Sequence, residues 1–194
     1  MAFSRSGQLY LGRNTRNRAV TASKRLGGAD PAAYVHPSSR VATNLVAGPY
    51  DSIGRNCDIA PRLTIRRYKM LASDVGVVGD DHNWSKPGVP MQFAGRPAQR
   101  GTTIGAGAWL GHGVIVMTEV TSGDTAIIAA RAVVTKDAPA FEVRAGTPAK
   151  KIHERFANAL ARGSHGAILE GTFTRPAFAE RRGGYGDAVD GGSA

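Results

Sequence analysis

Residues 35–77 read, in blocks of six, VHPSSR VATNLV AGPYDS IGRNCD IAPRLT IRRYKM LASDVG V. Every block begins with an apolar residue, and these eight are Val35, Val41, Ala47, Ile53, Ile59, Ile65, Leu71 and Val77. Because 42% of the chain is hydrophobic, a run of eight at one phase arises by chance in roughly one of a thousand trials. The period returns further on, with one polar exception, at Ile104, Leu110, Val116, Ser122, Ile128 and Val134.

Two other positions of the six-residue unit are also regular. The residue after the apolar one is often small, as at Gly48 and Gly54, and the fourth residue after it is a second inward candidate, as at Leu45 and Leu63. A period of six fits neither a 3.6-residue helix nor strands that alternate and turn as hairpins. It is typical of a triangular solenoid, whose sides are short strands and whose corners need small residues.

Three such sides make a coil of about 18 residues, and neighbouring coils stack about 4.8 Å apart, the usual spacing between strands. The pattern therefore predicts an all-β protein, a parallel β-helix of four to five coils over residues 35–148, in the shape of a triangular prism.

The period also locates an interruption. The spacing from Val77 to Ile104 is not a multiple of six, and the segment between them is polar and rich in turn residues. We expect residues 79–103 to leave the prism as an excursion loop, and a loop of that length is usually functional.

The flanking segments are predicted from composition and spacing. Residues 1–34 are a basic arm with a short helix over 15–26, and residues 149–162 are a capping helix because Ile152, Phe156 and Leu160 recur at helical spacing. Residues 163–194 are rich in glycine, arginine and small residues, so we expect disorder there.

Composition limits the function classes. With 194 residues the chain is long enough for one domain, and its charge of +10 favours anionic partners. One cysteine, Cys57, excludes an internal disulfide framework and a Cys-only zinc site. Neither an 18-residue apolar stretch nor a signal-peptide pattern occurs, so we expect a cytoplasmic protein with no membrane span.

Three motifs carry a resemblance to a known family. They are IGAGAWLGH at residues 104–112, AARAVVTKD at 129–137 and AGTPAKKI at 145–152. The chain resembles the hexapeptide-repeat, left-handed β-helix acyltransferases, in the branch of maltose, galactoside, polysaccharide and xenobiotic O-acetyltransferases. The resemblance implies a left-handed coil, a homotrimer with sites between subunits, acetyl-CoA as co-substrate and a sugar or glycan hydroxyl as acceptor.

The resemblance also implies a catalytic residue. A histidine at the base of such a loop is the general base in this family, and His82 holds that place here. A neutral imidazole can take the acceptor proton and return it to the departing thiolate, while Asp80 or Asp81 could fix its tautomer. The residues expected to bind the acceptor are Asp81, Asn83, Trp84 and Trp109.

The cofactor residues implied by the motifs are His112, Ala130, Thr135, Lys136, Lys150 and His153, with Lys151 near enough to assist. A lysine supplies a point charge for the phosphates of coenzyme A, and a small residue leaves room for its pantetheine arm. Cys57 falls at an inward position, so we expect it to pack rather than attack, which favours direct transfer. The run Asp80–His82 has no second ligand cluster, so we expect that no metal is required.

Two alternatives belong to other classes of protein. The first is a non-catalytic trimeric scaffold whose basic arm and tail bind an anionic polymer such as nucleic acid. The second is a metalloenzyme similar to the γ-carbonic anhydrases, which needs three histidines across subunits and is weakened because only His82 lies in the excursion.

Overall fold

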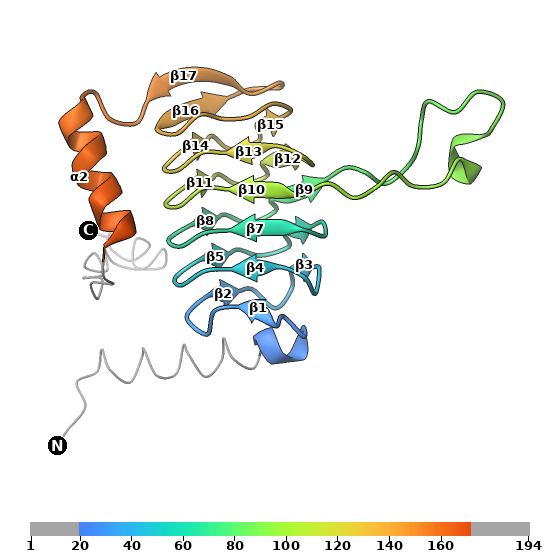
Figure 1. Cartoon of the computed structure of the whole chain (residues 1–194), viewed down its shortest axis with the longest axis horizontal. Helices are drawn as coiled ribbons and strands as arrows, with labels where there is room; N and C mark the ends of the chain where they lie inside the picture. The colour runs from blue at the N-terminus through green and yellow to red at the C-terminus, as the bar shows by residue number, and fades with distance from the viewer. Residues whose placement is uncertain (1–19, 172–194) are drawn as a thin grey trace, which may run out of the picture.

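The structure, a computed structural model, describes residues 20–171 and is a triangular prism of stacked coils (Figure 1). Sheet A has the order β1 (Gly28–Ala29), β4 (Val46–Ala47), β7 (Leu63–Ile65), β10 (Thr102–Ile104) and β13 (Thr121–Ser122). Sheet B has β2 (Tyr34–Val35), β5 (Ser52–Ile53), β8 (Met70–Leu71), β11 (Trp109–Leu110), β14 (Ile127–Ile128), β16 (Glu142–Ala145) and β17 (Lys150–Glu154). Sheet C has β3 (Arg40–Val41), β6 (Asp58–Ile59), β9 (Gly76–Val78), β12 (Ile115–Met117) and β15 (Val133–Val134).

The register confirms the predicted parallel β-helix. Ser52 pairs with Met70 and Asp58 with Gly76, so each partner lies three six-residue units further along the chain. Strands β1–β15 make five coils, and the chain winds left-handed as the resemblance implies (Figure 1). The prism begins one strand earlier than predicted, at Gly28, because Ala29 lies six residues before Val35 and continues the six-residue repeat.

The predicted inward residues form one continuous core. All fourteen first-position residues are buried except Val41, which is half-buried, and the predicted Ser122 exception is buried too. The second inward position is also confirmed, with Leu45, Cys57 and Leu63 each 1% exposed. Each coil thus sends apolar side chains into the interior of the prism from all three sides.

Each corner of the prism needs both space for the neighbouring coil and a residue at which the chain turns, and the prediction from sequence assigned both to the small residue. The small residue after each inward position is needed because the next coil passes very close: a Cβ on Gly54 would lie 2.7 Å from the carbonyl carbon of Ala72. The turn itself falls two residues later, where the backbone is left-handed, as at Asn56 (φ 52°) and Arg62 (φ 63°). The small residue therefore leaves space for the neighbouring coil, and the residue two positions later makes the turn.

The excursion is an insertion that leaves the register intact. Leu63 pairs with Thr102, far beyond one coil length along the chain, so all of the extra residues between them are accommodated in the loop. The loop leaves after β9 and projects away from the prism, with a short 3-10 helix, η1 (Met91–Phe93), near its tip (Figure 1). Its predicted end at residue 103 is late, since Thr102–Ile104 already form β10.

The C-terminal region differs from the prediction. Residues 150–154 are not helical but form β17, antiparallel to β16, because an open last strand leaves backbone groups that a further strand can pair. The helix, α2, spans Ala159–Glu170, and the Asn158 side chain accepts a hydrogen bond from Ala161 N at 2.8 Å. Ile152 and Leu160, 63% and 81% exposed, form no packed face.

The same helix corrects the predicted tail. Residues 163–170 are helical within α2, where the ring of His165 packs against Phe156 at a tilt of 54°, with ring centroids 5.0 Å apart. The remaining tail, 172–194, lies outside the described residues, as do residues 1–19 of the basic arm and of its predicted helix; residues 20–23 are helical. No helix within residues 20–171 is long and apolar enough to cross a membrane.

One charged pair lies inside the prism. Asp51 and Lys69 occupy the second inward position on successive coils, 1% and 0% exposed, with Nζ and Oδ2 4.0 Å apart. The Asp51 carboxylate accepts hydrogen bonds from Gly48 N (2.7 Å) and Lys69 N (3.0 Å), and Lys69 Nζ donates to Arg66 O. Burial raises the pKa of Asp51 to about 6 and lowers that of Lys69 to about 7, while each partially offsets the other.

Candidate active site

The excursion begins and ends in a polar clamp. The Asp80 carboxylate, 4% exposed, accepts hydrogen bonds from Arg100 N at 2.9 Å and from Arg100 Nη2 at 3.0 Å. Burial of this carboxylate opposes its ionisation, but the hydrogen bonds from Arg100 and Thr118 outweigh it and lower the pKa of Asp80. Asp80 therefore joins the two stems of the loop and does not orient His82.

His82 lies just beyond this clamp and is exposed. Within residues 20–171 no hydrogen bond or ion pair reaches its imidazole, and it lines a shallow hollow with Pro90, Met91 and Gln92. Asp81 is also exposed and makes no such contact in the described part of the chain. The imidazole is thus presented outward, open to a molecule that approaches from outside.

The acceptor residues predicted from the sequence take different parts. Asn83 closes the neck of the excursion, because its backbone N–H donates to Gly95 O (3.0 Å) and its Nδ2 donates to Ala94 O (3.1 Å). Trp84 is 80% exposed on the excursion. Trp109 lies on the outward face of sheet B beside Met70, and these two are 45% and 53% exposed.

The first group of predicted cofactor residues lies along the edge between sheets B and C. His112 follows β11, and its Nδ1 lies 3.3 Å from Asp74 Oδ2 on the coil below. Ala130 sits on the coil above, where a Cβ on Gly111 would come within 2.7 Å of Ala130 N. Near the upper coils, small residues and the imidazole of His112 therefore line this B–C edge.

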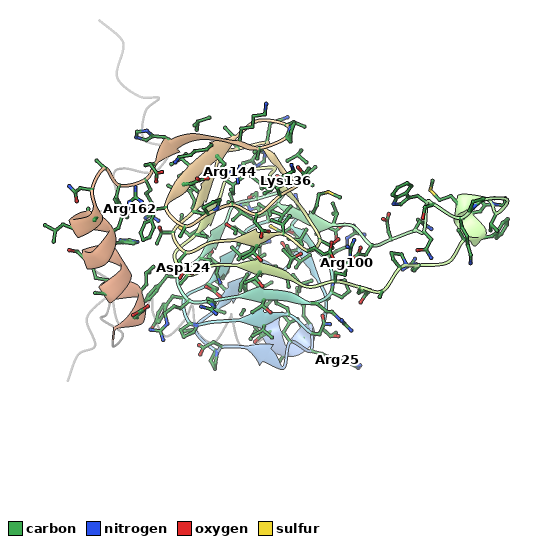
Figure 2. All side chains as sticks on the ribbon, turned by 45° about the horizontal axis from the view of Figure 1, so that its top comes forward. Arg25, Arg100, Asp124, Lys136, Arg144 and Arg162 are labelled. Carbon is green, nitrogen blue, oxygen red and sulfur yellow. The ribbon has the colours of Figure 1, made fainter. Side chains whose placement is uncertain are left out.

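The second group lies at the last coil of the prism. Thr135 and Lys136 follow β15 and are exposed, with Lys136 on the upper part of the molecule in Figure 2. Lys150 and His153 are exposed on β17, in sheet B. Lys151 is already paired, since its ammonium contacts Glu154 and lies 3.6 Å from Glu142 Oε1.

The described residues hold no competing nucleophile at this surface. Cys57 is 1% exposed inside the prism, its Sγ lies 3.2 Å from Ala72 O, and burial raises the pKa of its thiol. Among residues 20–171 no three histidine, cysteine or carboxylate side chains gather as a metal-binding group. The polar chemistry of the site therefore centres on His82 and the exposed basic residues.

In a single chain, His82 and the B–C edge do not meet. The excursion leaves from the edge between sheets C and A, whereas His112 and Ala130 lie on the edge between B and C. The third edge, between A and B, is covered by α2, where Leu169 packs close to Gly107 (Figure 1). The predicted catalytic residue and the first cofactor group therefore lie on different edges of the prism.

Comparison with known proteins gives the family. No family model matches the chain. It is 29% identical over 137 residues to a chloramphenicol acetyltransferase of Morganella morganii, covering 66% of this chain and 59% of that protein. Over 116 residues it is 30% identical to the galactoside O-acetyltransferase of Escherichia coli K12, covering 54% and 57%. Over 125 residues it is 30% identical to a probable macrolide acetyltransferase of Lysinibacillus sphaericus, covering 56% and 69%.

Solved structures agree on the fold. A hexapeptide-repeat acetyltransferase from Vibrio cholerae has a TM-score of 0.57 at 17% identity, over 79% of this chain and 90% of that one. A galactoside acetyltransferase in complex with coenzyme A has a TM-score of 0.54 at 21% identity, over 79% and 86%. The chain belongs to the hexapeptide-repeat acetyltransferases. It spans a little under three fifths of the Morganella and Escherichia relatives, 59% and 57% of their lengths.

Proposed function

We propose that the chain transfers an acetyl group from acetyl-CoA to a hydroxyl of a sugar, polysaccharide or similar small acceptor. Acetyltransferase relatives, one of which acts on galactosides, support the reaction class. A neighbour of the same fold is named as a complex with coenzyme A, which supports the donor. The observation that carries the proposal is His82, an exposed imidazole held on a clamped excursion that points away from its own prism.

The active unit is a homotrimer in which the excursion of one copy meets the B–C edge of the next. The excursion exposes Trp84, Met91 and Phe93, at 80%, 57% and 72%, and an isolated chain leaves this apolar surface in water. Met70 and Trp109 on sheet B offer an apolar surface beside the B–C edge. A cyclic arrangement of three copies would cover both surfaces at once and bring His82 to His112 and Ala130 of a neighbour.

The reaction is a direct transfer within a ternary complex. The neutral imidazole of His82 takes the proton of the acceptor hydroxyl while that oxygen attacks the thioester carbonyl. The carbon–sulfur bond then breaks, and the imidazolium returns the proton to the thiolate of coenzyme A. No enzyme-bound acyl group is needed, which accords with Cys57 being enclosed in the core.

Acetyl-CoA is bound through its phosphates by basic side chains and through its pantetheine arm at a surface of small residues. Lys136 and Lys150 provide exposed ammonium groups for the phosphates of coenzyme A, beside Thr135 and His153 at the same end of the prism. The narrow pantetheine arm lies against the B–C edge, where Ala130 leaves room for it.

The test is release of free thiol from acetyl-CoA, measured with a panel of glycosides and repeated with His82→Ala. We expect at least one glycoside to stimulate thiol release and the variant to abolish that stimulation. The matched control is His36→Ala, which removes a half-buried imidazole from the far end of the prism. No stimulation by any acceptor, with coenzyme A failing to bind a folded trimer, would favour the non-catalytic scaffold instead.

A further inference from the structure

Three residues at the edge between sheets C and A occupy equivalent corner positions. Arg62, Asp80 and Glu119 all have a left-handed backbone, with φ of 63°, 55° and 71°. Asp80 lies one coil length after Arg62, and Glu119 lies one coil length plus the inserted loop after Asp80. Asp80 therefore still makes a normal corner of the prism, and the excursion departs only after it.

Arg100, on the returning stem, connects these corners. Its Nε and Nη2 lie 3.3 Å and 3.0 Å from Asp80 Oδ1, its backbone N–H bonds Oδ2, and its Nη1 pairs with Glu119 on the coil above. Thr118 adds a hydrogen bond to the same Asp80 carboxylate. One guanidinium thus ties the outgoing stem, the returning stem and the next coil together.

The coil below grips the same stem. Arg62 Nη1 donates to Gln99 O at 3.1 Å, and Thr102 N donates to Arg62 O at 3.3 Å. Gly79 lies close against Thr118 of the coil above, since a Cβ added to it would lie 2.5 Å from Thr118 Oγ1. The base of the excursion is therefore held from both neighbouring coils, and Figure 2 shows Arg100 where the loop meets the prism.

We propose that Arg100 is a positioning residue for acetyl transfer, which sets the direction in which the excursion carries His82. This inference rests on the proposed function. His82 follows Asp80 with only Asp81 between them, so a rotation of the stem at Asp80 displaces the imidazole directly. Arg100 touches neither donor nor acceptor in this account, and it acts through its contacts with Asp80 and Glu119.

The clamp matters for geometry more than for global stability. Arg100 is 51% exposed, and exposed ion pairs add little to folding stability. No inward aliphatic residue of the prism depends on the excursion, because the coils pair in register across it. A displacement of about 1 Å at a reacting group, in contrast, can cost about a hundredfold in rate.

Kinetics on the full-length protein test this. Arg100→Ala should lower kcat by about 10- to 100-fold while the KM for acetyl-CoA stays within about threefold, since the donor is held elsewhere. Arg100→Lys should recover part of the rate, because it restores one charge without the two-sided fork. The matched control is Arg96→Ala, an exposed arginine of the same excursion that has no ion pair among the described residues.

A kcat equal to that of Arg96→Ala would overturn the proposal. So would a loss of kcat that Arg100→Lys leaves unchanged and that parallels a lower melting temperature, which would mean a purely structural role. If Arg100→Ala does not fold, Glu119→Gln removes one arm of the clamp at a half-exposed site, and it should lower kcat with the KM for acetyl-CoA kept.

Amide hydrogen exchange separates this inference from the proposed function. In Arg100→Ala the Asn83 N–H, bonded to Gly95 O, should exchange faster, while the prism amides of β7 and β12 keep their protection. If the wild-type protein transfers no acetyl group, the proposed function fails, and faster exchange at Asn83 still supports the clamp. Unchanged exchange at Asn83 would overturn the clamp whatever the activity.

Discussion

The buried pair of Asp51 and Lys69 makes the sharpest prediction about stability. We expect Lys69→Met, which keeps most of the length of the side chain and removes its charge, to cost little at neutral pH and more at alkaline pH. The side chains are 1% and 0% exposed, and the same column of the prism continues upward through Ala108, so an apolar side chain suits the position.

Two effects decide how much stability Lys69→Met loses: the charge left unpaired on Asp51, and the protonation that can remove it. Removing one partner of a buried pair usually costs about 3–5 kcal/mol, because the other charge stays buried alone. Asp51 can instead take up a proton: with its pKa at about 6, protonation at pH 7 costs only about 1 kcal/mol. Loss of Lys69 raises that pKa further and lowers the cost. Protonation therefore wins, and the destabilisation at pH 7 should not exceed this protonation cost.

The pH dependence of stability follows from the directions in which the pKa values of Asp51 and Lys69 are shifted. The folded-state pKa of Asp51 is raised from 3.8 to about 6, so its contribution to stability is present at acid pH and is lost by about pH 6. The pKa of Lys69 is lowered from 10.5 to about 7, so wild-type stability recovers as pH rises above 7. The variant lacks this recovery. The stability difference should therefore grow by at least about 2 kcal/mol between pH 5.5 and 8.5.

Urea unfolding at both pH values and one fixed protein concentration measures this difference. Lys86→Met, which removes an exposed lysine of the excursion, is the matched control and should show almost none of it. Asp51→Asn combined with Lys69→Met should equal or exceed wild-type stability near pH 6.5, where both wild-type groups are charged. A Lys69→Met difference that is the same at pH 5.5 and 8.5 would refute the reasoning.

Three further predictions concern the donor site and the fold. Lys136→Ala should weaken coenzyme A binding more at low salt than at high salt in calorimetric titrations, because a lysine–phosphate contact is screened; an equal loss at both would mean a structural role. Gly54→Ala should lower the free energy of unfolding by about 1–3 kcal/mol, since its Cβ would press on Ala72; an unchanged urea midpoint would contradict the close stacking. Asn158→Ala should destabilise α2 by about 1 kcal/mol, seen as faster amide exchange in α2 alone, and uniform protection would argue against the cap.

Periodicity made most of the fold predictable. Every inward position supports the same six-residue repeat, so a single deviation, such as half-buried Val41, does not change the predicted fold. The pair of Asp51 and Lys69 was not predicted, because only apolar residues were counted at the second inward position; both nevertheless follow an inward residue by four positions and lie one coil apart. The C-terminal helix was misplaced because the spacing of Ile152 and Leu160 mimics a helix, whereas the open edge of β16 decides the structure.

The candidate site was predictable only where it lies on the repeat. His112 and Ala130 take known corner positions, so their shared edge follows from the six-residue phase. Arg100 was not predictable, because the excursion has no period and its contact with Asp80 spans 20 residues. The role of Asn83 as a neck residue was missed for the same reason, since its partners lie on the returning half of the loop.

The central claim is that His82 removes the acceptor proton, and the turnover of His82→Ala tests it most directly. With an acceptor identified by thiol release, the variant should lower kcat by about 10²- to 10⁴-fold, the usual contribution of a positioned general base. Coenzyme A affinity and melting temperature should stay at the wild-type values, because the nucleotide is held near Lys136 and the exposed imidazole contributes nothing to the core. Turnover within a few-fold of the wild-type value would contradict the claim.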